Sequence, residues 1–213
     1  MKFLSLFFLL FLPKKIKPLY CNKILKWNVH ETALIGFAYL DIGYLELGEG
    51  SIIKSLTIFR NMDKVIVGDF SRIGTLNWIS GARSNNEGNS ILKLGIHSAI
   101  TNRHYIDCTN VFSIGNFSTF AGVKSTVMTH SINVYASVQG SNKIVVGDFC
   151  FIGTCTTLLG GAVIPDFCII GACALVTGEL KNTHSLYGGV PATKIKSLGT
   201  DLAYFNRKYG SVS

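Results

Sequence analysis

The sequence predicts an all-β protein: a parallel β-helix of hexapeptide repeats with an N-terminal helix, projecting loops and a short C-terminal helix. Three observations predict this fold class. Aliphatic residues recur at every sixth position over 146–181, which reads VGDFCF IGTCTT LLGGAV IPDFCI IGACAL VTGELK. Small residues or cysteine take the fifth place of every block but the last. The chain also holds 22 glycines and only 15% charged residues, which suits a structure with many tight turns.

A period of six fits neither an amphipathic helix, which repeats every three or four residues, nor a single strand, which alternates. It fits a solenoid in which each block forms one short strand and one turn, and three blocks close a triangular coil. The residue that opens each block then points into the coil and stacks on its equivalent in the next. We expect glycine at the second place to permit the tight turn.

The same frame continues upstream, so we place the β-helix at residues 31–196. Isolated copies of the block start at Ile35 and Leu47, and longer runs of blocks cover 67–84, 94–111 and 114–131. Loops project from a solenoid at little cost and often carry specificity. Three interruptions are expected to form such loops: 85–93, 112–113 and 132–145.

Residues 1–30 form the predicted N-terminal segment, a helix that is apolar with basic flanks. Ten helical residues rise about 15 Å, which is too short to cross a bilayer core. The residues after the apolar run, Pro13-Lys14-Lys15, offer no small-residue cleavage site, which disfavours a signal peptide. The helix therefore docks on an anionic membrane surface, on the rest of the protein or on a partner subunit, and the sequence leaves these open.

Residues 197–213 are the predicted C-terminal capping helix and tail. The stretch TDLAYFNRKYG is compatible with a short helix whose N-cap is Thr200 or Asp201. The last coil of a repeat stack exposes an apolar end unless another element covers it. We therefore expect this segment to close the open end of the solenoid.

Composition and cysteine usage favour a cytoplasmic protein with an anionic partner. The formal net charge is +8, and no basic stripe interleaved with aromatic residues is visible, so no nucleic-acid partner is expected. The spacing from Cys150 to Cys168 equals that from Cys155 to Cys173, which places each pair at equivalent positions of adjacent coils. We expect reduced, partly buried thiols. Peripheral contact at the inner face of the membrane remains open.

Three stretches resemble the hexapeptide-repeat acyltransferases, and in particular the maltose, galactoside and xenobiotic O-acetyltransferases. VMTHSIN (127–133) resembles the segment that holds their catalytic histidine, and KIVVGDFCFIGTCTTLLGGAVI (143–164) resembles the restart of their repeat. GGVPATKIK (188–196) is similar to their closing segment. The resemblance implies a left-handed β-helix, acetyl-CoA as acyl donor without a metal, and a homotrimer with active sites between its subunits.

The resemblance also implies an O-acetyltransferase that acts on a carbohydrate, in surface glycan or polysaccharide biosynthesis. His130 is the implied general base, because an imidazole can take the acceptor hydroxyl's proton at neutral pH. The hydroxyl would then attack the acetyl carbonyl directly. A surface turn histidine is the plain alternative for His130. An N-acyltransferase for an amino sugar or small amine, and a non-catalytic β-helix scaffold, stay open as alternative functions.

Other polar residues near His130 are candidate acceptor contacts. His104 would line the acceptor side or serve as the base itself. Asp107 sits near the acidic acceptor-binding residues of the family, and a carboxylate binds a sugar diol well, although aspartate is also common in turns. Asn110 takes the same block position as His130 one coil earlier, so it would orient the imidazole, contact the sugar or simply stack in the turn.

Coenzyme A is expected in a groove between two neighbouring solenoids. Small turn residues would let its pantetheine run close to the backbone, although the repeat itself also requires small residues there: Gly153, Thr154, Gly171 and Ala172. The nucleotide end is expected near the closing segment, where lysines would meet phosphates as point charges or simply be solvated. The candidates there are Thr177, Ala192, Lys194 and Lys196.

Overall fold

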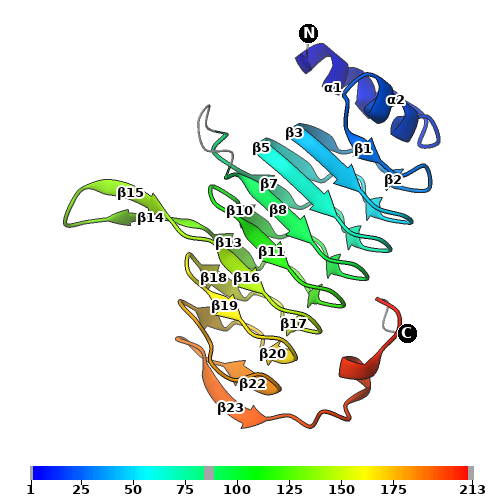
Figure 1. Cartoon of the computed structure of the whole chain (residues 1–213). Helices are drawn as coiled ribbons and strands as arrows, with labels where there is room; N and C mark the ends of the chain where they lie inside the picture. The colour runs from blue at the N-terminus through cyan, green and yellow to red at the C-terminus, as the bar shows by residue number, and fades with distance from the viewer. Residues whose placement is uncertain (1, 84–88, 211–213) are drawn as a thin grey trace.

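The computed structural model describes residues 2–83 and 89–210 and shows a triangular parallel β-helix (Figure 1). This confirms the predicted fold class, the left-handed parallel β-helix. Two helices, α1 (Lys2–Phe11) and α2 (Lys17–Lys23), lie at one end of the solenoid, and the last strands, β22 and β23, lie at the other. The described part of residues 1–30 is therefore mainly helical, as predicted.

A 12-stranded sheet forms two sides of the triangle, because β3 and β5 are long enough to run through a corner. Its strands, all paired in parallel, are β1 (Asn28–Val29), β3 (Tyr39–Leu47), β5 (Ile58–Val67), β7 (Trp78–Ser80), β8 (Ile91–Leu94), β10 (Tyr105–Asp107), β11 (Phe112–Ile114), β13 (Thr126–Met128), β16 (Ile144–Val146), β18 (Thr157–Leu159), β19 (Val163–Ile164) and β21 (Leu175–Val176).

A nine-stranded sheet forms the third side, and its last pair, β22 and β23, is antiparallel. Its strands are β2 (Leu34–Ile35), β4 (Ile52–Ile53), β6 (Arg72–Ile73), β9 (Ala99–Ile100), β12 (Thr119–Phe120), β17 (Phe151–Ile152), β20 (Cys168–Ile170), β22 (Ser185–Gly188) and β23 (Thr193–Ser197). The antiparallel turn from β22 to β23 ends the repeat.

The core consists of columns of block-opening residues, as the period of six predicts. On the third side, the column stacks in register through successive coils, and each member is at most 1% exposed: Ile73, Ile100, Phe120, Ile152 and Ile170. The fifth place is buried as well, since Cys150 and Cys168 are both fully buried. Side chains at these two places therefore fill the triangle and hold adjacent coils together.

The tight corner of each block lies at the fourth place and not, as expected, at the second-place glycine. Phe149, Cys155 and Phe167 occupy it with left-handed φ angles of 54°, 57° and 60°. The second-place glycine is needed for a different reason, the close approach of the next coil. A Cβ atom at Gly153 would lie 2.7 Å from the backbone nitrogen of Ala172, which is closer than atoms can pack.

One extra residue enters the repeat between Phe120 and Val127, just before the segment 127–133 that contains His130. Phe120 pairs with Ile100, whereas Val127 pairs with Ile106, so this block has seven residues where the preceding coil has six. Continued along the chain, this register sets His130 opposite Thr109. The prediction that Asn110 and His130 share a block position is therefore wrong, because the six-residue count misses the insertion.

A β-hairpin interrupts the solenoid directly after β13. Its strands, β14 (His130–Asn133) and β15 (Val138–Ser141), pair antiparallel and project away from the coils as the yellow-green arm in Figure 1. The predicted loop at 132–145 is therefore an ordered hairpin that starts two residues earlier. The predicted loop at 85–93 falls partly on residues 84–88, which lie outside the described residues.

An aromatic column runs along the corner at which the chain enters the nine-stranded sheet, just before each of its strands from β6 to β22. Its rings stack at centroid distances of 4.4–5.2 Å and belong to Phe70, His97, Phe117, Phe149, Phe167 and His184. Each of these residues sits at the left-handed corner position of its coil. The stack gives the C-terminal segment an apolar surface to lie on.

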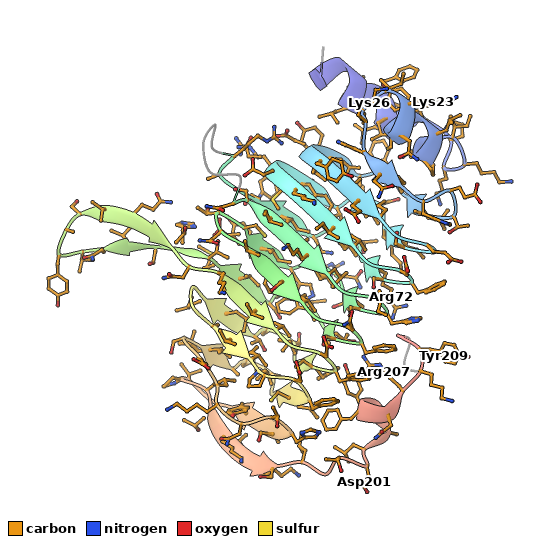
Figure 2. The ribbon with its side chains drawn as sticks, viewed as in Figure 1. Lys23, Lys26, Arg72, Asp201, Arg207 and Tyr209 are labelled. Carbon is orange, nitrogen blue, oxygen red and sulfur yellow. The ribbon has the colours of Figure 1, made fainter. Side chains whose placement is uncertain are left out.

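The C-terminal segment runs back along this aromatic column and does not close the end of the solenoid, in contrast to the prediction (Figure 2). Phe205 packs edge-on against Phe167, the Tyr204 hydroxyl donates to the Cys150 carbonyl at 3.0 Å, and the Tyr209 ring meets His97 edge-on. Its helix is a single 3₁₀ turn, Ala203–Asn206. The predicted caps are absent, because Leu202 is the N-cap and makes no side-chain cap bond.

Candidate active site

His130 lies where β13 ends and the hairpin begins. Val127 anchors β13 in the core, and the extra residue upstream brings His130 to the corner at which the chain leaves the solenoid. The imidazole is one-third exposed, and its Nδ1 lies 2.9 Å from Oδ2 of Asp107. Among the described residues, none forms a hydrogen bond with Nε2. Nδ1 likewise makes no hydrogen bond within the part of the chain that the structure describes, although the Asp107 carboxylate lies beside it. A partly exposed imidazole next to a carboxylate can exchange a proton with a ligand.

Asp107 is buried beneath His130 and is held by two threonines. Its Oδ2 accepts from the Thr129 amide at 3.0 Å and from the Thr129 hydroxyl at 2.7 Å, while Oδ1 accepts from the Thr109 hydroxyl at 2.8 Å. Burial raises the pKa of Asp107, but these hydrogen bonds, with the neighbouring His130, outweigh burial and lower its pKa. The group is therefore a carboxylate at neutral pH.

The position of Asp107 changes its predicted role. Only 5% of the residue is exposed, and its oxygen atoms face Thr109, Thr129 and His130 and not a ligand. In the single chain, Asp107 is therefore not placed to bind the acceptor, the role for which it was a candidate in the sequence. Oδ2 lies 2.9 Å from Nδ1 of His130, but the pair does not have the geometry of an N–H hydrogen bond, so Asp107 acts on the ring as a neighbouring negative charge.

Asn110 connects this pair to the hairpin. Its Nδ2 donates to the Ser141 hydroxyl at 3.1 Å, and Ser141 pairs with His130 across β14 and β15. The Asn110 amide also donates to the Thr129 hydroxyl at 3.0 Å, the same hydroxyl that donates to Asp107. Asn110 thus ties the base of the hairpin to the neighbouring coil, and its three predicted roles stay predictions.

His104 lies in the interior, away from His130. It is 2% exposed; its Nδ1 accepts from the Ser125 amide at 3.2 Å, and its Nε2 lies 2.9 Å from the Thr101 hydroxyl. Burial lowers the pKa of His104 to about 4. Both ring nitrogens are occupied inside the chain, so the structure does not support the predicted contact with the acceptor or a role as base.

We expect His104 to make stability depend on pH. Its imidazole stays neutral in the folded chain down to about pH 4, whereas the unfolded chain takes up that proton near pH 6.5. The free energy of unfolding should therefore fall as the pH falls from about 6.5 to about 4. Urea denaturation at neutral pH and near pH 4.5 measures this loss, which His104→Gln should reduce. The exposed His30→Gln is the control, and an unchanged loss in His104→Gln would contradict the expectation.

The residues predicted to bind coenzyme A follow His130 along successive coils. Gly153 and Thr154 precede β18, which pairs with β13, and Gly171 and Ala172 lie one coil further on. The Thr154 hydroxyl is engaged with the backbone of Val123, to which it donates at 2.8 Å. Strands β13 and β18 are neighbours on one side of the triangle. Gly153 and Thr154 lie before β18, at one end of that side, whereas His130 lies after β13, at the other end.

The predicted nucleotide-binding residues cluster near the last strand. Thr177, Lys194 and Lys196 are exposed, and the half-buried Ala192 donates its amide to the Leu175 carbonyl at 2.7 Å. Thr177 directly follows β21, Ala192 lies just before β23, and Lys194 and Lys196 are in β23, so all four belong to the final coils. Within the described part of the chain, no group of three or more His, Cys, Asp or Glu residues is arranged to hold a metal ion.

Sequence reasoning missed Thr109, Thr129 and Ser141, which support the histidine. Thr129 directly precedes His130, but its partner Asp107 lies 22 positions earlier, and only the register of two coils joins them. A groove of about 520 Å³ also runs along the hairpin. Its lining includes Ile132, Val134 and Tyr135, whose side chains are 70%, 78% and 99% exposed.

Comparison with solved structures finds hexapeptide-repeat acyltransferases. The polysialic acid O-acetyltransferase OatWY matches with a TM-score of 0.61 at 16% identity, over 80% of this chain and 84% of that one. A maltose O-acetyltransferase from Clostridium difficile 630 matches at 0.53 and 16%, over 66% and 71%. A variant of AntD, an N-acyltransferase from Bacillus cereus in complex with dTDP and coenzyme A, matches at 0.53 and 19%, over 81% and 84%.

No family model matches the sequence, and no curated protein matches it. At the identities of the structural matches, the similarity establishes the fold. One fold can host several reactions, so the reaction is inferred from the residues around His130.

Proposed function

We propose that this protein is an acetyl-CoA-dependent O-acetyltransferase that acts on a carbohydrate acceptor in surface glycan or polysaccharide biosynthesis. The observation that supports this most is the His130–Asp107 pair, a partly exposed imidazole with Nδ1 at 2.9 Å from a buried carboxylate. Two proteins of the same fold are a polysialic acid O-acetyltransferase and a maltose O-acetyltransferase, which favours a glycan acceptor and O-acetylation.

In the proposed mechanism, Nε2 of His130 takes the proton of the acceptor hydroxyl. At the same time, the hydroxyl oxygen attacks the acetyl carbonyl of acetyl-CoA. The tetrahedral intermediate then expels the coenzyme A sulfur, which receives the proton from the imidazolium. The Asp107 carboxylate, 2.9 Å from Nδ1, stabilises the positive ring by its charge. Backbone amides would stabilise the oxyanion. No covalent enzyme intermediate is needed, because both substrates are bound together.

We propose a homotrimer in which each site lies between two subunits. Two features of the chain support this. The predicted coenzyme A residues and His130 lie apart on one chain, and the hairpin presents exposed apolar side chains that a neighbour would cover. Gly153, Thr154, Gly171 and Ala172 would follow the pantetheine, and the nucleotide end would meet Thr177, Ala192, Lys194 and Lys196.

We place the reaction in the cytoplasm, with peripheral contact at the inner face of the membrane. All six cysteines are free thiols, which is typical of proteins in a reducing compartment. Cys155 and Cys173 are exposed and lie at equivalent corners of adjacent coils without forming a disulfide.

An N-acyltransferase is the second candidate, because AntD has this activity and shares the fold over most of both chains. An imidazole base serves an amine acceptor as well as a hydroxyl. The carbohydrate class therefore needs a direct test.

The test is a thiol-release assay with acetyl-CoA across sugars, nucleotide sugars, oligosaccharides and amino sugars. We expect coenzyme A release with hydroxyl acceptors and a mass gain of one acetyl group on the product. Coenzyme A release with amino sugars only would refute the O-acetyltransferase proposal and support an N-acyltransferase. A calorimetric titration that shows no binding of acetyl-CoA or coenzyme A would leave only the scaffold function.

A further inference from the structure

The N-terminal helices present an apolar outer face. Leu6 and Leu9 of α1 are buried against the solenoid at 5% and 2% exposure. The intervening and following phenylalanines, Phe7, Phe8 and Phe11, are 54%, 58% and 66% exposed. A helix that is apolar on both faces is normally covered on both. Only one face of α1 is covered by the described chain.

The apolar face continues from α1 onto the first coils. The Phe11 ring meets Phe37 edge-on at 5.9 Å, and Phe37 begins a column at one corner that continues with Leu56 and Leu76. These three side chains are 48%, 55% and 45% exposed. A groove of about 350 Å³ with an almost entirely apolar lining lies beside them, between Leu10 and the coils. We call Phe7, Phe8, Phe11, Phe37, Leu56 and Leu76 the N-terminal apolar surface.

The segment that builds one edge of this surface also contains exposed basic side chains, and it contains no acidic ones. Residues 2–29 contain no aspartate or glutamate. Lys14, Lys15, Lys23 and Lys26 are exposed, and Figure 2 shows the last two beside the N-terminal helices. Lys17 has a different role, because it is buried and its Nζ donates to the Gly36 carbonyl at 2.7 Å, which ties the segment to the first coil.

We propose that the N-terminal apolar surface docks on an anionic lipid bilayer, with its phenylalanines among the headgroups and acyl chains and the four lysines against lipid phosphates. Aromatic and aliphatic side chains with flanking lysines suit such an interface. A second copy that pairs this surface with itself fits less well, because lysines would face lysines. In the proposed homotrimer each contact joins two different surfaces, and we assign that contact to the hairpin side of the chain. The inference extends the proposed location and does not depend on the reaction.

The surface is suited to lie on a bilayer and not to cross one. In the described chain, no helix combines the length and the hydrophobicity that crossing a membrane requires. The ten residues of α1 rise about 15 Å, roughly half of the hydrocarbon core. Binding should therefore be reversible and sensitive to salt, because part of it is electrostatic.

Sedimentation of the full chain with vesicles tests the proposal. We expect binding to vesicles of phosphatidylcholine with phosphatidylglycerol, weaker binding to phosphatidylcholine alone, and release by high salt. The variant Phe7→Ser/Phe8→Ser/Phe11→Ser should lower the partition coefficient at least about tenfold, and Lys14→Gln/Lys15→Gln about tenfold or more. Tyr209→Ser and Lys181→Gln/Lys208→Gln, exposed residues elsewhere on the chain, are matched controls that should change it little.

Two results would overturn the proposal: no binding of the wild-type chain to either vesicle, or binding that the phenylalanine variant leaves unchanged. Light scattering reveals the alternative, in which the wild-type chain is an oligomer and the phenylalanine variant is a monomer. If vesicle binding is unchanged in that variant, the surface is a contact with a second copy of the chain and not with lipid. Acetyl transfer to a soluble acceptor should be the same in the variant and the wild type. Failure of the proposed reaction and failure of lipid binding are therefore separate results.

Discussion

Replacing His130 with alanine is expected to lower kcat/KM for acetyl transfer by about 10²–10⁴-fold, because the acceptor hydroxyl loses its general base. The side chain is one-third exposed, so the midpoint of thermal unfolding should change little. Coenzyme A release with the acceptor identified by the thiol-release assay measures the effect. His30→Ala is the matched control, since this histidine is exposed and, within the described chain, its ring forms hydrogen bonds with Thr32 alone. Near-wild-type activity of His130→Ala would refute the assignment.

Asp107→Asn separates catalysis at His130 from simple loss of the side chain. The amide keeps the size of Asp107, but it cannot stabilise an imidazolium by its charge. We expect a loss in kcat with a smaller change in KM. A variant that lost activity only through unfolding would show wild-type kcat and KM once its activity is normalised to the folded fraction.

Replacing Phe120 with alanine is expected to reduce the free energy of unfolding by about 3–5 kcal/mol. The ring is fully buried between Ile100 and Ile152, and it packs edge-on against Phe112 and His104 at centroid distances of 5.9 and 4.9 Å. An alanine leaves a cavity at the point where two columns of the core meet. It also removes the anchor of the seven-residue block that leads to His130.

Urea denaturation at several protein concentrations measures this effect, because association with other subunits would add to the apparent stability. Phe70→Ala is the matched control: this ring is 51% exposed at a corner, and we expect a loss of about 1 kcal/mol or less. Equal losses in the two variants would mean that the block-opening column is not the main source of stability.

The sequence by itself determined the architecture. A β-helix repeats one local interaction, an aliphatic side chain that points inward once per short strand, and this leaves a period of six that can be counted. The same count located the buried Ile152 and Ile170 and the buried cysteines at the fifth place. His130 was singled out by its segment, and the structure sets it at the start of a projecting hairpin.

Only the tertiary structure decided how the site is built. One extra residue after Phe120 moves every later side chain of that block by one place, so His130 faces outward over Asp107 while Asn110 turns to Ser141. Such an insertion leaves only a weak signal in the sequence: the six-residue count puts the polar Thr126 at the opening place, whereas the structure buries the adjacent Val127. The C-terminal segment shows the same limit, since its path along the aromatic column depends on rings that distant coils bring together. The repeat pattern predicts the conformation of each coil. Contacts between side chains of different coils depend on how the coils stack, which only the tertiary structure shows.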